Sequence, residues 1–170
     1  MGLLPSLAMA PKRTRDAYES PSLHTLIRRS WEQPRERDLV ELLGALPLFA
    51  RLNKRQLRAL ARHAKIADYE PGDVIIQKGD RGDSFYLVLD GGATVVGRGR
   101  TLGPGEFFGE IALIDAGPRS ATVKAVTGVR TMRLPRRAFV QALKNDPQIA
   151  FAIMQELAGR VRRLEVPTSV

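Results

Sequence analysis

The chain has 170 residues and a mass of 18.8 kDa, a length that favours one domain with an appendage. Apolar residues make up 44% of it and charged residues 26%, as in ordinary globular proteins. The absence of cysteine excludes disulfides, thiolate catalysis and metal sites built on cysteine. The two histidines, His24 and His63, lie far apart in the sequence and match no metal-ligand spacing. We therefore expect binding chemistry without a metal.

The net charge of +9 is unevenly distributed along the chain. Residues 1–66 carry 13 basic and 6 acidic side chains, residues 67–128 carry 6 and 9, and residues 129–170 carry 8 and 3. Charged helical flanks are typical of solvated surfaces. They also leave open an accessory role in binding nucleic acid or another polyanion.

Residues 1–35 contain four prolines and scattered charges, a pattern typical of a flexible basic leader. One short helix, from Leu23 to Arg29, is the only element expected there. The apolar stretch after Met1 is short and interrupted by Pro5, so we expect neither a signal peptide nor a membrane span. These features favour a cytoplasmic protein.

Helical and β patterns follow one another from Glu36 onward. Apolar spacing up to Pro47 and an N-cap residue, Asn53, predict two helices within residues 36–63. Dense glycines and a period of two predict a β-roll over residues 64–134. Its expected strands are Lys65 to Tyr69, Val74 to Gln77, Ser84 to Leu89, Ala93 to Val96, Arg100 to Leu102, Ala121 to Val126 and Val129 to Leu134.

The helical period returns over residues 135–165, with a break at Asn145-Asp146-Pro147. The last predicted helix has one apolar stripe, formed by Ile149, Ile153, Leu157, Val161 and Leu164. The expected fold is α+β and mainly β: an eight-stranded antiparallel, jelly-roll-like β-roll with N-terminal helices, two C-terminal helices and a tail at 166–170.

Residues 103–123 hold the candidate site. A glycine-rich approach opens into a short apolar helical turn, Gly109 to Ile114, and helix N-termini offer N–H groups to anions. Arg119 follows, and its planar guanidinium suits phosphate oxygens. Glu110 would be a poor phosphate ligand but a good acceptor for a sugar hydroxyl. The pair indicates a nucleotide-sized ligand with one anionic end and one hydroxyl end.

Two runs resemble the phosphate-binding cassette of the cyclic nucleotide-binding domain: Phe108-Gly109-Glu110-Ile111-Ala112-Leu113 and Pro118-Arg119-Ser120-Ala121-Thr122-Val123. This family includes catabolite activator protein, cAMP-dependent kinase regulatory subunits and cyclic-nucleotide-gated channels. Upstream, residues 79–91 are similar to the family's glycine-acidic turn and the strand after it. The resemblance covers about Asp38 to Leu164, and we expect residues 36–165 to form the domain.

The resemblance implies a role for each residue of the cassette. Arg119 would pair with the cyclic phosphate, and Glu110 would accept a hydrogen bond from the ribose 2′-OH. The backbone N–H groups that would line the phosphate belong to Gly109, Ile111, Ala112 and Ala121. Threonine at the Ser120 position accompanies cGMP in the family and alanine accompanies cAMP, so serine leaves the choice open, and we favour cAMP. Phe108 is a candidate for stacking on the base, although its place after a Gly-Pro-Gly turn also suits the core.

In the family the last helix closes over the base, which would place Arg160, Val161, Arg163 and Leu164 near the purine. We expect a sensor of cAMP or cGMP, not an enzyme, that moves this helix and so regulates an unidentified protein effector. The same helix is a candidate homodimer contact. Only six residues follow Leu164, so we expect no DNA-reading domain.

Three alternatives compete with this interpretation. A jelly-roll metalloenzyme would need histidines inside the barrel, and no predicted strand contains one. Two alternatives stay open: a cytosolic piece of a larger channel or kinase complex, and a basic module that binds nucleic acid or another polyanion on a fold that has lost its nucleotide. Steep salt dependence of binding to long DNA or RNA would mark the basic module.

Overall fold

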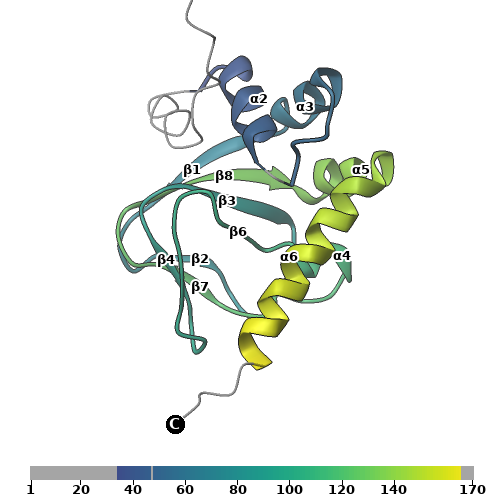
Figure 1. Ribbon diagram of the computed structural model, residues 1–170. Helices are drawn as coiled ribbons and strands as arrows, with labels where there is room; N and C mark the ends of the chain where they lie inside the picture. The colour runs from purple at the N-terminus through teal and green to yellow at the C-terminus, as the bar shows by residue number, and fades with distance from the viewer. Residues whose placement is uncertain (1–33, 47, 166–170) are drawn as a thin grey trace, which may run out of the picture.

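The computed structural model describes residues 34–46 and 48–165, and the helix expected between Leu23 and Arg29 lies outside them. Eight strands form two four-stranded sheets, preceded and followed by helices (Figure 1). This arrangement confirms the predicted fold class. The strands are β1 (Lys65–Tyr69), β2 (Val74–Ile76), β3 (Ser84–Asp90), β4 (Ala93–Val95), β5 (Arg100–Leu102), β6 (Phe107–Phe108), β7 (Val123–Ala125) and β8 (Val129–Pro135). The helices are α2 (Glu36–Ala45), α3 (Lys54–Ala61), α4 (Ile111–Ile114), α5 (Arg136–Asn145) and α6 (Pro147–Glu165).

The strand order is β1-β8-β3-β6 in one sheet and β2-β7-β4-β5 in the other. All paired strands run antiparallel. Strand β6 is the one that the sequence pattern does not predict, because two residues are too few to show an alternation. It pairs with β3 through Tyr86 with Phe108 and Leu87 with Phe107, which brings the start of the cassette against the central strand.

Strand β3 is buried on both of its faces. Successive side chains of a strand point to opposite sides, so β3 contributes to two separate cores. Phe85, Leu87 and Leu89 pack in the cluster that includes the helices. Tyr86 and Val88 pack in the cluster between the two sheets. Strand β3 therefore separates the helical layer from the interior of the β-roll.

Helices α2, α3 and α5 lie together above the sheet that contains β1, β8 and β3 (Figure 1). Helix α3 begins with a capping box, in which Asn53 Oδ1 accepts from the Gln56 amide and Gln56 Oε1 accepts from the Asn53 amide, each at 2.9 Å. Below these helices Phe85 stacks on Phe139 of α5 and contacts Phe49 edge-on. The aromatic cluster fixes α5, and with it the start of α6, against the sheet.

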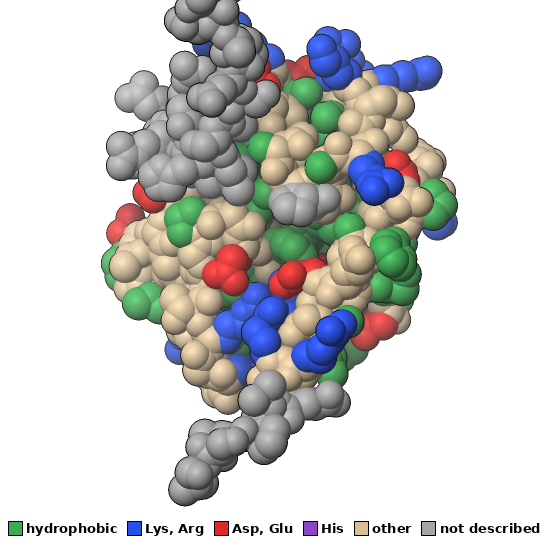
Figure 2. All heavy atoms as spheres, viewed as in Figure 1, with side chains coloured by type: hydrophobic (Ala, Val, Ile, Leu, Met, Phe, Trp, Pro, Cys, Tyr) green, Lys and Arg blue, Asp and Glu red, His purple; other side chains and the backbone are tan. Residues whose placement is uncertain are grey.

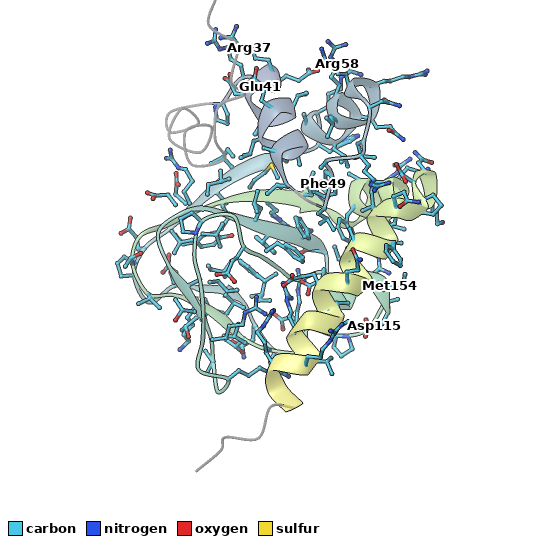
Figure 3. The ribbon with its side chains drawn as sticks, viewed as in Figure 1. Arg37, Glu41, Phe49, Arg58, Asp115 and Met154 are labelled. Atoms are coloured by element: carbon cyan, nitrogen blue, oxygen red, sulfur yellow. The ribbon has the colours of Figure 1, made fainter. Side chains whose placement is uncertain are left out.

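Helix α6 runs along one side of the β-roll, away from α5 (Figure 1). Of the predicted apolar stripe, Ile149 and Ile153 are buried, Leu157 is half-buried and Val161 is 51% exposed. Phe151 and Met154 are more than half exposed, and Met154 lies on the side of α6 that faces away from the roll (Figure 3). The stripe thus packs firmly only over the first part of the helix. No helix within 34–46 or 48–165 is long and apolar enough to cross a membrane.

Phe139→Ala should lower the free energy of unfolding by about 3–5 kcal/mol, the usual cost of removing a buried phenylalanine. Its ring is fully buried and lies 4.9 Å from the ring of Phe85. The measurement is urea denaturation. Phe151→Ala is the matched control, because Phe151 is 53% exposed and its loss should cost no more than about 0.5 kcal/mol. Equal losses for the two variants would contradict this account of the core.

Candidate functional site

The cassette, residues 108–123, begins with a glycine that the backbone requires. Gly109 has φ +86°, a left-handed conformation that side chains with a Cβ rarely adopt. A Cβ at this position would lie 2.7 Å from Arg119 Nη1 and 3.0 Å from the Ser84 carbonyl oxygen. Glycine therefore allows the guanidinium to approach the chain. The single-turn helix α4 follows, with Glu110 as its N-cap residue.

Arg119 lies at the centre of the site and is only 3% exposed. Its Nη1 donates to the Gly109 carbonyl and its Nη2 to the Ser84 carbonyl, both at 2.8 Å. A longer contact of 3.4 Å joins Nη2 to Asp83 Oδ1. An arginine has five N–H donors, so these three contacts leave two donors for a further acceptor.

The turn before β3 holds the backbone of Arg119. The Gly79 amide donates to the Arg119 carbonyl at 2.9 Å, and the Arg119 amide donates to the Asp80 carbonyl at 2.8 Å. In the same turn, a Cβ on Gly82 would lie 2.5 Å from the Cβ of Ala112 in α4. The glycine-acidic turn and the cassette are thus packed as one unit, although about 30 residues of chain separate them.

A cavity of about 290 Å³ opens beside the guanidinium. This is close to the lower end of the usual size range for small-molecule sites. Its walls come from β2, the turn after it, β3 and the cassette, and they comprise Val74, Ile75, Ile76, Gln77, Asp80, Arg81, Asp83, Tyr86 and Arg119. Within the described part of the chain, no three metal-ligating side chains converge. The arrangement presents a buried cation at a cavity that can admit an anion.

Glu110 is 1% exposed and forms an ion pair with Arg160 of α6. Arg160 also donates to the Phe107 carbonyl at 3.1 Å and to Glu156 at 3.2 Å. Its guanidinium lies 4.8 Å from the centre of the Phe107 ring, within the range of a cation–π contact. Charged side chains gather where α6 crosses the roll (Figure 2). The ion pair fastens the last helix to the cassette.

Burial raises the pKa of Glu110 above its ordinary value of 4.5, because a carboxylate that loses water is disfavoured. The positive charge of Arg160 opposes this effect and is the largest of the causes that lower the pKa. Glu110 is therefore an acceptor whose charge depends on the helix that covers it.

The other predicted site residues lie in different surroundings. Phe108 is buried and stacks on Tyr86 at 5.1 Å between ring centres, so its ring fills the inner core. Ile111 and Ser120 are exposed, Ala112 is buried and Ala121 is half-buried. Arg163 pairs with Glu156, Val161 is half exposed, and the side chain of Leu164 is not among those described. The roles of these residues toward a ligand stay predictions.

Three residues at the site are missing from the sequence prediction. Asp83 contacts Arg119 and Arg133, and Tyr86 lies 5.7 Å below the Arg119 guanidinium. Asp83 could have been found from the sequence, because it is an acidic residue in a glycine-rich turn. Arg133 is a charged residue within an otherwise largely buried strand, and Tyr86 looks like any core aromatic. Neither has a signal that points to this site.

Comparison with known proteins agrees with this geometry. Residues 66–146 match the model of the cyclic nucleotide-binding domain. The chain contains a domain of this family. This confirms the family that the cassette resembles.

Two curated relatives and one solved structure illustrate the likeness. A cyclic nucleotide-gated potassium channel of Rhizobium etli is 37% identical over 135 residues, which are 76% of this chain and 38% of the channel. The cAMP-dependent protein kinase regulatory subunit of Schizosaccharomyces pombe is 38% identical over 116 residues, 65% of this chain and 28% of the subunit. The regulatory subunit of a cAMP-independent protein kinase A from Trypanosoma brucei superposes with a TM-score of 0.63 at 29% identity, covering 71% of this chain and 47% of that one. The chain thus spans less than half the length of each of these proteins.

Glu110 should make stability depend on pH in one direction. The folded protein holds the Glu110 proton more tightly than the unfolded chain, because burial raises the folded-state pKa above 4.5. The residue therefore favours folding below pH 4.5, and this contribution is lost as the pH rises through the folded-state pKa. Relative to Glu110→Gln, the wild type should lose unfolding free energy across that window.

Urea denaturation of both proteins between about pH 4 and pH 8 measures this difference. Arg160→Met removes the main charge that lowers the Glu110 pKa, so the loss should continue to a higher pH. A difference between wild type and Glu110→Gln that does not change with pH would contradict the prediction.

Proposed function

We propose that residues 36–165 form a cyclic nucleotide sensor, in which Arg119 binds the cyclic phosphate and Glu110 accepts from the ribose hydroxyl. The observation that supports this most is the buried Arg119 guanidinium, with three donors engaged by Gly109, Ser84 and Asp83 and two left over. A charged donor fixed at a small cavity is suited to a singly charged phosphodiester. The proposal describes binding without catalysis and without a metal.

The choice of cAMP over cGMP is part of the proposal. The name of the fission yeast relative includes cAMP, whereas the trypanosome subunit belongs to a protein kinase A that is described as cAMP-independent. The fold by itself therefore does not decide the ligand. Ser120 is exposed at the end of the cassette, where a hydroxyl could favour either base. Calorimetric titration with cAMP, cGMP and AMP decides between them and also tests the requirement for a cyclic phosphate.

Arg119→Ala should weaken cAMP binding by at least thirtyfold, since truncating a buried charged partner costs about 2–5 kcal/mol and about 1.4 kcal/mol corresponds to a factor of ten. Calorimetry measures the affinity. Arg130→Ala is the control, because Arg130 pairs with Asp68 at 2.6 Å and lies outside the cavity wall. The affinity of this variant for cAMP should equal that of the wild type.

Unchanged affinity in a folded Arg119→Ala variant would remove Arg119 from the site. Failure of the wild type to bind any cyclic nucleotide would instead favour a basic module that has lost its ligand. In that case binding to long DNA or RNA should weaken steeply with salt.

We also propose that α6 is the moving part and that its movement signals to a protein effector. A ribose hydroxyl that donates to Glu110 would share the carboxylate with Arg160, which contacts Oε1, and would weaken the ion pair because the same negative charge then meets two donors. A ligand shifts a helix only if it binds the two positions of the helix with different affinity. Competition for Glu110 supplies such a difference. A homodimer through α6 and a cytoplasmic location stay predictions.

Hydrogen exchange should therefore differ in α6 with and without saturating cAMP. We expect the amides of residues 151–157 to change their exchange rates, while those of the buried strand β3 (residues 85–89) stay constant. Arg160→Ala should raise exchange in the same part of α6 without any nucleotide, because it removes the ion pair with Glu110. Identical rates in α6 under all these conditions would contradict a moving helix.

A further inference from the structure

A second arginine lies close to the cassette but outside the cavity wall. Arg133, on β8, donates from Nε to Ser84 Oγ at 2.7 Å and from Nη2 to Asp83 Oδ2 at 2.5 Å. Strands β8 and β3 are neighbours in the sheet, with Arg133 opposite Tyr86. The Arg133 guanidinium therefore reaches the end of β3, where Asp83 and Ser84 meet Arg119.

Asp83 is bound by two arginines through different oxygens. Its Oδ2 lies 2.5 Å from Arg133, and its Oδ1 lies 3.4 Å from Arg119. The carboxylate is thus held mainly by Arg133 and only loosely by Arg119. This matters because a carboxylate in full contact with Arg119 would compete with a phosphate for the same donors.

The charges around the cavity point to the same conclusion. Asp80 and Arg81 also line the cavity and are of opposite sign, as are Asp83 and Arg119. Tyr86 adds no charge near neutral pH, because the pKa of a phenol is ordinarily about 10 and burial raises the pKa of Tyr86 further. Without Arg133, the two negative and two positive charges of these four residues would sum to zero. With it, one positive charge remains, which matches the single negative charge of a cyclic phosphodiester.

We propose that Arg133 is a positioning residue of the phosphate site. It holds Asp83 and offsets the charge of that carboxylate, so that Arg119 stays available to an anion. The inference rests on the proposed function, since it concerns the strength of cyclic nucleotide binding. A purely structural role, in which Arg133 only ties β8 to the end of β3, makes different predictions.

The test measures cAMP affinity by calorimetry in four variants. Arg133→Gln should weaken binding about three- to tenfold, as expected for one charge a few ångströms from a partly solvated phosphate. Arg133→Lys keeps the charge and should retain affinity within about threefold. Arg130→Gln, on the same strand but paired with Asp68, should leave affinity unchanged. Arg133→Gln combined with Asp83→Asn should recover most of the loss, because the carboxylate that needs offsetting is gone.

The structural alternative predicts that the double variant binds no better than Arg133→Gln. That result, or an equal loss in Arg133→Lys and Arg133→Gln, overturns the inference. Urea denaturation of each variant establishes that it is folded. If Arg133→Gln does not fold, the comparison of Arg133→Lys with the wild type and with Arg130→Gln still tests whether a charge at this position is sufficient.

A readout without nucleotide separates this inference from the proposed function. In Arg133→Gln the Asp83 carboxylate should move onto Arg119, and the Arg119 side-chain N–H signals should shift in the NMR spectrum. Arg130→Gln should leave these signals in place. A wild-type protein that does not bind cAMP overturns the proposed function, whereas unchanged Arg119 signals in Arg133→Gln overturn the role of Arg133.

Discussion

Arg119 carries a positive charge into a place almost closed to water, and the acceptors around it decide what the site can bind. A charge is stable there only because two carbonyl groups and a carboxylate meet three of its donors. These acceptors come from the cassette, from β3 and from the turn before it. The guanidinium is therefore oriented before any ligand arrives, and little side-chain freedom is left to be lost on binding.

The second buried charge, Glu110, ties the site to the last helix. The first part of α6 is fixed by the burial of Ile149 and Ile153, whereas the cassette contact further along depends on Arg160. An apolar contact is insensitive to charge, but an ion pair responds to pH, to salt and to competing acceptors. The two parts of α6 are thus held by different physical forces. The later part contacts the cassette directly through Arg160, and the earlier part responds to the cassette only through the helix itself.

Most of the fold follows from local patterns in the sequence. The glycine turns and the change of period give strands and helices whose bounds agree with the structure to within a few residues. Asn53 caps α3, and the break at Asn145-Asp146-Pro147 marks the start of α6. The two-residue strand β6 has no such pattern. Arg119 and Glu110 are also visible in the sequence, because they are charged residues in a glycine-rich, apolar stretch.

The partners of these residues are not visible in the sequence. Arg119 is held by carbonyl groups of Ser84 and Gly109, and every residue has a carbonyl, so no residue type marks those positions. Glu110 and Arg160 are 50 residues apart. The resemblance implies a sugar hydroxyl for the first and a place near the purine for the second, but it does not predict the ion pair between them. Such contacts depend on how β6, α4 and α6 pack, which local periodicity does not encode.

Strand β3 separates two hydrophobic cores, with Phe85 and Leu87 packed on the helical side and Tyr86 and Val88 packed on the inner side. A single inserted or deleted residue within it would exchange these two sets of side chains at once. Tyrosine would then meet the helices, and phenylalanine would face the interior of the roll. Substitutions along β3 can be absorbed one at a time, but its length cannot vary. During divergence of this fold, changes of chain length should therefore be confined to the turns and absent from this strand.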